Sequence, residues 1–111
     1  PRLIGWQKAS ALMMLGARVS AEEAERIGMI YQFFPDEIFI ENSMNIAKFL
    51  AQMPTKGLAY TKKVLGDSFT NTFEQQLQEE DIFQMKASQT EDYKEGVKAF
   101  MEKRKATFKG Q

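Results

Sequence analysis

Helix-start and helix-stop signals recur along this sequence at intervals that leave room for helices joined by short connections. Ser20 and Thr90 each stand directly before a stretch rich in acidic residues, as helix-capping residues do. Pro35 and Pro54 interrupt the chain where one element must end or another begin. Between these signals, apolar residues recur three and four positions apart, which is the spacing of one helix face. The sequence therefore predicts a mainly all-α fold of about six helices.

The predicted helices differ in length and in how each begins. The first predicted helix is Trp6–Leu15. The second is short, begins with the capping box Ser20–Glu23 and ends at Gly28. The third begins at Asp36 and carries one apolar stripe, made of Ile40, Met44, Ala47 and Ala51. The last three begin at Pro54, within Asn71–Glu74, and at Thr90, the sixth with Tyr93, Val97, Phe100 and Met101 on its apolar stripe. The run 29–34 favours one short β-strand, which Pro35 ends.

Composition excludes several classes of function. Fifteen Lys and Arg balance fifteen Asp and Glu, so no nucleic-acid partner is indicated. The chain has no apolar run of the roughly 18 residues that a membrane span requires. It contains no Cys and no His, which excludes Ser-His-Asp and Cys-His catalysis within these 111 residues and makes a metal site unexpected. Its length allows one small domain.

Two charged clusters each allow a structural and a functional interpretation. The acidic run Glu79–Asp81 could hold a pair of carboxylates, but adjacent helix positions diverge by about 100°, which favours a solvated face. A basic cluster near the end comprises Lys98, Lys103, Arg104, Lys105 and Lys109. These cations could offset the dipole of the sixth helix or bind the phosphates of a ligand. Phe100 lies one turn before Lys103, and an aromatic ring beside a cation suits a purine that carries phosphates, although periodicity alone would make Phe100 a core residue.

Several segments together resemble the enoyl-CoA hydratase/isomerase (crotonase) family. They are Pro1–Gly5, Ala11–Gly16, Val19–Ala24, Gly28–Ile30 and Asp92–Phe100, with Lys103–Arg104 after them. The likeness covers nearly all of the chain, and the tail from Phe100 to Lys109 is especially similar to mitochondrial-type and bacterial hydratases. The resemblance implies that residues 1–111 are a single helical domain, the C-terminal region of such an enzyme, and that the N-terminal catalytic core precedes the point that matches Pro1.

The resemblance implies a role in acyl-CoA chemistry without assigning a catalytic residue. In the family, backbone N–H groups stabilise an enolate and one or two carboxylates move protons, and all of them precede this region, so the chain alone is expected to be inactive. Phe100 and Lys103 match an aromatic residue and a lysine that meet the CoA adenine and phosphate in a neighbouring subunit. The region would also serve trimer or hexamer contacts and close the acyl pocket. No cofactor is expected, because coenzyme A belongs to the substrate.

Several alternatives remain open at this stage. Hydratases (a class of lyase), isomerases and dehalogenases of the family share this C-terminal pattern, so the pattern does not determine which reaction the enzyme catalyses. Fatty-acid and phenylacetate types of degradation are both compatible with it. The resemblance implies a bacterial cytoplasmic protein, with the mitochondrial matrix as the alternative location. A different class of function is an autonomous helical protein-interaction module that binds no ligand.

Overall fold

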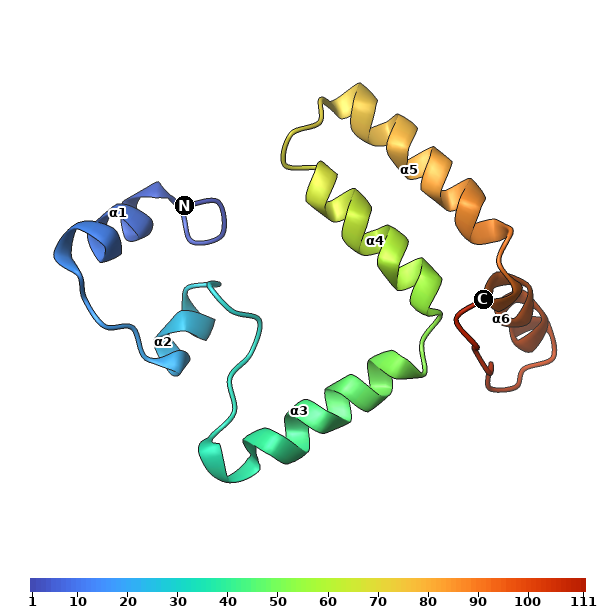
Figure 1. Cartoon of the computed structure of the whole chain (residues 1–111), viewed down its shortest axis with the longest axis horizontal. Coiled ribbons are helices and arrows are strands. Elements are labelled where there is room, and N and C mark those ends of the chain that lie inside the picture. The colour runs from blue at the N-terminus through green and yellow to red at the C-terminus, as the bar shows by residue number, and fades with distance from the viewer. The chain divides into compact units, whose positions relative to one another are not determined.

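The computed structural model describes all 111 residues, which form six α-helices and no β-strand (Figure 1). The predicted all-α architecture is therefore confirmed. The chain forms two compact units, residues 1–44 and 45–111, and the boundary between them falls inside the third helix. No helix combines the length and the apolarity needed to cross a bilayer.

The first unit contains α1 (Trp6–Leu15), α2 (Ala21–Arg26) and the first turns of α3 (Asp36–Ala51). Ser20 caps α2 as predicted, because its hydroxyl accepts the backbone N–H of Glu23 at 3.1 Å. The second half of the predicted capping box does not form. The Glu23 carboxylate instead accepts two hydrogen bonds from Arg26, at 2.6 and 2.7 Å, and pairs with Lys8 of α1 at 3.3 Å. These ion pairs, led by the bond from Arg26, hold the pKa of the Glu23 carboxyl at about 2.

The strand expected over residues 29–34 does not form, and this prediction was wrong. The backbone N–H groups of Met29 and Ile30 both donate to the carbonyl of Ala24, at 2.8 and 3.3 Å, so they serve the end of α2. Gly28, with φ 76°, makes the left-handed turn that directs them there, as the sequence predicted for the end of this helix. β-Propensity needs a neighbouring strand to take effect, and the first unit has none.

The second unit contains the end of α3, then α4 (Thr55–Asp67), α5 (Phe73–Ser88) and α6 (Glu91–Met101). Helices α4 and α5 lie side by side and antiparallel (Figure 1). The rings of Tyr60 and Phe83 meet between them with centroids 5.4 Å apart, and the Gln76 side chain donates to the carbonyl of Val64 at 3.4 Å. After α6 the chain turns back, so that the segment 104–111, here called the tail, lies against α6 (Figure 1).

Few apolar side chains are buried in either unit. The buried apolar residues are Ala9, Ala24 and Ala99. The predicted stripes of α3 and α6 are helical faces, but their large side chains stay in contact with solvent: Ile40 is 70% exposed and Phe100 is 81% exposed. The interpretation of Phe100 as a core residue is therefore wrong for this chain. Apolar faces of this extent usually mark surfaces that meet another protein surface.

Candidate functional site at the end of helix α6

Helix α6 ends in a turn of the Schellman type, with a lysine where glycine is usual. The N–H of Arg104 donates to the carbonyl of Ala99 at 3.0 Å, and the N–H of Lys103 donates to that of Phe100 at 3.2 Å. This geometry requires a left-handed residue, and Lys103 supplies it with φ 53°. Helices α1 and α2 place Gly16 and Gly28 at their left-handed ends. Lys103 is the one non-glycine residue of the chain with positive φ, and such backbone strain is concentrated at functional sites in proteins.

The turn brings together the two residues that the sequence marked as candidates for binding. Phe100 lies in the last turn of α6, and Lys103 follows the helix, joined to Phe100 by the backbone hydrogen bond of the turn. Both side chains are exposed, and the Lys103 ammonium makes no ion pair or hydrogen bond within the chain. An exposed aromatic ring and an unpaired cation are therefore both available to a ligand at this end of the helix.

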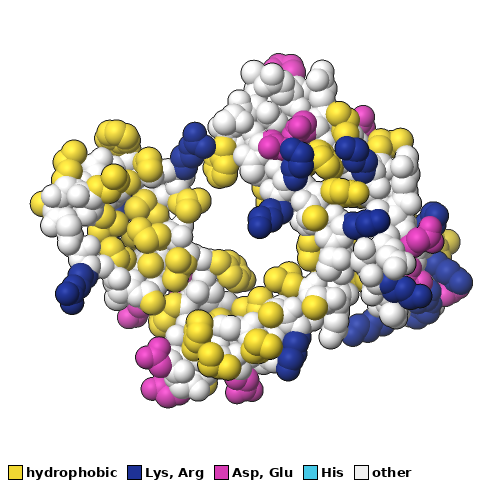
Figure 2. Space-filling model, in the orientation of Figure 1, with side chains coloured by type: hydrophobic (Ala, Val, Ile, Leu, Met, Phe, Trp, Pro, Cys, Tyr) yellow, Lys and Arg dark blue, Asp and Glu magenta, His cyan; other side chains and the backbone are white.

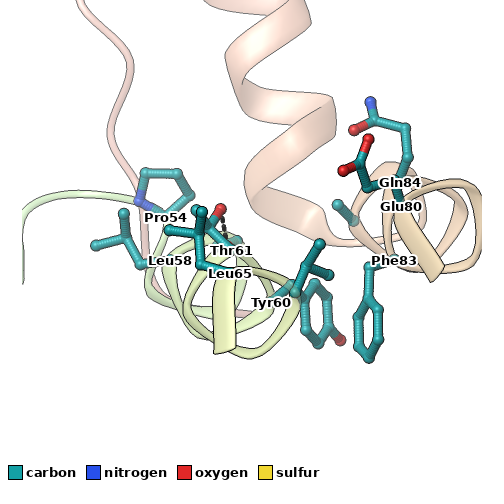
Figure 3. A pocket seen from close by; sticks show the side chains of 11 residues that line it. Pro54, Leu58, Tyr60, Thr61, Leu65, Glu80, Phe83 and Gln84 are labelled. Atoms are coloured by element: carbon teal, nitrogen blue, oxygen red, sulfur yellow. Dashed lines mark hydrogen bonds between the residues drawn. The ribbon is translucent and has the colours of Figure 1, made fainter. Parts of the chain in front are cut away.

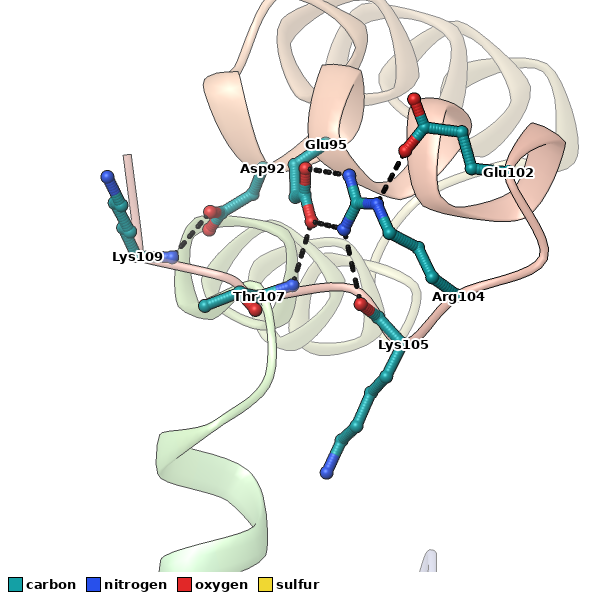
Figure 4. Close-up of polar contacts among 7 residues, drawn as sticks. All are labelled: Asp92, Glu95, Glu102, Arg104, Lys105, Thr107 and Lys109. Carbon is teal, nitrogen blue, oxygen red and sulfur yellow. Dashed lines mark hydrogen bonds and ion pairs between the residues drawn. The ribbon is translucent and has the colours of Figure 1, made fainter.

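Arg104, the neighbour of Lys103, is occupied by carboxylates. Its guanidinium donates two parallel hydrogen bonds to Glu95, from Nη1 to Oε1 at 2.6 Å and from Nη2 to Oε2 at 2.8 Å (Figure 4). Its Nε donates to Glu102 at 2.6 Å, and Nη1 also reaches the carbonyl of Lys105 at 3.2 Å. A guanidinium held in this way has few donors left for a ligand. Arg104 is thus removed from the predicted anion-binding cluster.

The tail is attached to α6 through the carboxylates of Asp92 and Glu95. Glu95 accepts the backbone N–H of Thr107 at 2.9 Å, and Asp92 accepts that of Lys109 at 2.7 Å (Figure 4). Asp92 also accepts the backbone N–H of Gly110 at 2.8 Å. Three positions separate Asp92 from Glu95, so they lie on one face of the helix. Asp92 is only 3% exposed, which fits a carboxylate whose oxygens are both engaged by backbone donors.

The electrostatics of this cluster follow from the same contacts. The hydrogen bonds from Arg104, and then that from the Thr107 amide, lower the pKa of Glu95 to about 2. The paired carboxylates raise the pKa of Arg104 above its ordinary value. Of the basic cluster, the ammonium groups of Lys98, Lys103, Lys105 and Lys109 form no ion pair. Figure 2 shows Lys and Arg side chains gathered over the region of α6 and the tail.

The second unit also has a groove of about 490 Å³ between α4 and α5, lined among others by Leu58, Tyr60, Leu65 and Phe83 (Figure 3). The Thr61 hydroxyl in its wall donates to the Gly57 carbonyl of its own helix at 3.0 Å. Glu80, from the acidic run of the sequence, lies at its edge and accepts from Gln76 at 3.0 Å. The groove is therefore mainly apolar, and no set of polar groups converges in it as a site for chemistry requires.

Sequence reasoning selected Phe100 and Lys103 but missed Asp92, Glu95 and the pairing of Arg104. In the sequence, Asp92 belongs to the acidic stretch after the capping residue Thr90, where a negative charge is favourable in the first turn of a helix. The available signal was the spacing of two acidic residues three positions apart on the face of α6 opposite the apolar stripe, followed by a basic tail. The spacing of the two acidic residues does not show that they bind the tail, because the sequence of the tail has no periodicity that would predict its position.

Comparison with known proteins defines the class. The family model for enoyl-CoA hydratase/isomerase matches residues 1–111. The chain is 40% identical over 110 residues to the 1,2-epoxyphenylacetyl-CoA isomerase of Escherichia coli K12, covering 99% of the chain and 42% of that protein. It is 34% identical to a probable enoyl-CoA hydratase of Rhodobacter capsulatus, covering 99% of the chain and 43% of that protein. A solved enoyl-CoA hydratase from Bacillus anthracis superposes with a TM-score of 0.92 at 31% identity, over all of this chain and 43% of that one.

This all-α chain is similar, along its full length, to part of a crotonase-type fold. The chain belongs to the enoyl-CoA hydratase/isomerase family. It spans less than half of the length of the relatives that it matches.

Proposed function

We propose that this chain forms the helical region of an acyl-CoA hydratase or isomerase, and that the end of α6 binds the adenine and phosphate part of coenzyme A through Phe100 and Lys103. The observation behind the proposal is the pairing of an exposed aromatic ring with an unpaired ammonium on one strained turn. Adenine offers a flat face for an aromatic ring, and its phosphates offer oxygens for an ammonium.

The neighbouring charges support Lys103 as the phosphate partner. Arg104 would be the stronger phosphate ligand by chemistry, but Glu95 and Glu102 already engage it. Lys103 keeps its ammonium unpaired beside this group of one guanidinium and two carboxylates. Its left-handed conformation costs free energy that a glycine would not require, and a need for the ammonium at this point accounts for that cost.

The exposed apolar faces support a second role in contacts with the rest of the enzyme and with other subunits. Trp6 and Met14 of α1 are 77% and 83% exposed, and Phe73 of α5 is 72% exposed. Side chains of this size are rarely left in water over whole helix faces. We infer that these faces close over the acyl pocket and form oligomer contacts, in a trimer or hexamer as the family resemblance implies.

The reaction and the substrate are proposed at the level of class. The relatives include an isomerase of an epoxyphenylacetyl-CoA and a 2,3-dehydroadipyl-CoA hydratase, so the shared chemistry is the conversion of an acyl-CoA thioester. We infer a bacterial, cytoplasmic enzyme of fatty-acid or phenylacetate degradation. No residue of this chain is given a catalytic role.

The second candidate function is an autonomous interaction module without a ligand. The exposed apolar faces favour it as much as they favour contacts within an enzyme. The two candidates differ in whether CoA reaches the end of α6. The test is lysine-reactivity footprinting of the complete enzyme with and without saturating CoA, read by mass spectrometry. We expect CoA to protect Lys103 and to leave Lys62 of α4, which is also exposed and without an ion pair, equally reactive. Equal reactivity of Lys103 with and without CoA would contradict the proposed site.

A further inference from the structure

We propose that Glu95 and Asp92 are positioning residues, which hold the turn after α6 so that the Lys103 ammonium faces the ligand. This inference rests on the proposed CoA site. The two carboxylates do not contact the ligand. They act through Arg104 and through the backbone of the tail.

The first step is the connection between Glu95 and Lys103. Arg104 follows Lys103 directly, and its guanidinium forms the two-pronged pair with Glu95 at 2.6 and 2.8 Å. The N–H of Arg104 also closes the turn onto Ala99. Backbone and side chain of Arg104 are therefore both attached to α6, and the residue before it has little freedom to leave its left-handed conformation. A bidentate pair fixes direction as well as distance, which a single contact from a lysine would not.

The second step is the continuation of this attachment along the tail. Glu95 Oε1 accepts from both Arg104 and Thr107, so one oxygen ties the start of the tail to its middle. Asp92, one turn earlier on α6, accepts from Lys109 and Gly110. Attached at both ends, the tail cannot peel away from α6 and take the turn with it.

The third step is the charge at the turn. If Arg104 were free, it would be a second cation beside Lys103 and could compete with it for the phosphate. The pairing of Arg104 with Glu95 and Glu102 leaves Lys103 as the unpaired cation of the turn. Glu95 therefore has two effects on the ligand, since it orients the turn and selects which cation is available.

The experiment is a double-mutant cycle in the complete enzyme, with CoA itself as the probe and calorimetric Kd and kcat as the readouts. Glu95→Gln keeps the size of the side chain and removes its charge. We expect it to raise the Kd for CoA roughly twofold to fivefold with kcat unchanged, because the chemistry is remote from the adenine end. In the Lys103→Ala background the same substitution should change the Kd by less than about 1.5-fold, since residues that act through one another are not additive.

Two controls separate positioning from loss of structure. Glu91→Gln breaks a 2.6 Å ion pair with Lys94 on the same helix. The Glu91 side chain makes no hydrogen bond or ion pair with the tail, so this substitution should leave the Kd for CoA unchanged. Arg104→Lys keeps the positive charge and loses the two-pronged geometry, so it should raise the Kd for CoA by the same factor as Glu95→Gln. It therefore tests the positioning role even if the Glu95→Gln variant folds poorly.

The outcomes distinguish the two proposals. If Lys103→Ala raises the Kd but Glu95→Gln has no effect, or has an equal effect in both backgrounds, the positioning role is wrong while the CoA site stands. If Lys103→Ala itself leaves the Kd unchanged, the proposed CoA site is wrong and the positioning role falls with it.

Discussion

The guanidinium of Arg104 and the carboxylate of Glu95 form two parallel hydrogen bonds of 2.6 and 2.8 Å between the tail and the middle of α6. This pair joins a helix to the segment that reverses direction after it. It also engages the guanidinium of the residue that follows Lys103, so that Lys103 is the unpaired cation of the turn.

The pair should respond to acid in a defined range of pH. The pKa of Glu95 is lowered from its ordinary value of 4.5 to about 2 in the folded chain, chiefly by the hydrogen bonds from Arg104. A carboxyl whose pKa is lower in the folded state stabilises that state at pH values above its unfolded pKa and loses this effect as the pH falls through its folded pKa. We expect the Thr107 amide, which donates to Glu95, to report a titration centred near pH 2 by NMR. A midpoint near 4.5 would mean that the pair does not form in solution, and Glu95→Gln should show no such titration.

The backbone of Lys103 can be separated from its charge by two substitutions. Lys103→Gly and Lys103→Ala both remove the ammonium, but only glycine adopts φ 53° without a steric cost. We therefore expect the glycine variant to be more stable to urea than the alanine variant by about 1 kcal/mol, while both bind CoA equally weakly. Equal stability would show that the left-handed turn is not maintained in solution.

Substitution by alanine should change the stability of the chain in opposite directions at two glycines, one within α6 and one in the tail. A Cβ at Gly96 would lie 3.6 Å from the Phe108 ring, an ordinary contact, so Gly96→Ala should stabilise the helix by about 0.5–1 kcal/mol. A Cβ at Gly110 would lie 2.5 Å from the Thr55 hydroxyl, and φ there is 74°, so Gly110→Ala should detach the end of the tail and lower the melting temperature. A Gly110→Ala variant that melts at or above the wild-type temperature would argue against the attachment of the tail.

The isolated 111-residue chain should self-associate. Large apolar side chains are exposed on every helix longer than α2, including Met13 at 80% on α1 and Met101 at 75% on α6. Surfaces of this kind usually find partners in water. Light scattering from micromolar to millimolar protein should give a mass above 12.7 kDa that rises with concentration. A mass that stays at the monomer value over this range would contradict the proposed contact role of these faces.

The local features of the fold could be predicted because their determinants lie within a few residues of each other. Ser20 and Thr90 cap helices by accepting an N–H three positions ahead, at 3.1 Å in both cases. The prediction of a strand at residues 29–34 was wrong because the β-propensity of a segment does not show whether a partner strand exists. The prediction that Phe100 is a buried core residue was wrong for a related reason. Periodicity identifies an apolar face but not the surface that covers it.

The contacts that complete the site span longer distances along the chain. Arg104 reaches back nine positions to Glu95, and Gly110 reaches back eighteen to Asp92. These contacts depend on the reversal of the chain at Lys103, a residue whose type gives no sign of a left-handed conformation. The family resemblance could therefore suggest Phe100 and Lys103 as candidates, while the residues that we propose to position them required the structure.

The most direct test of the CoA site is the KM of the complete enzyme for its acyl-CoA substrate after Lys103→Ala. A charge-assisted hydrogen bond is worth roughly 1.5–3 kcal/mol, and an exposed one less, so we expect KM to rise about threefold to tenfold at low ionic strength with kcat unchanged. The increase should shrink at high salt, where the wild-type contact is screened, whereas Phe100→Ala should raise KM with little dependence on salt. An unchanged KM at low ionic strength, in a variant that assembles and melts like the wild type, would show that Lys103 is a surface lysine without a role in CoA binding.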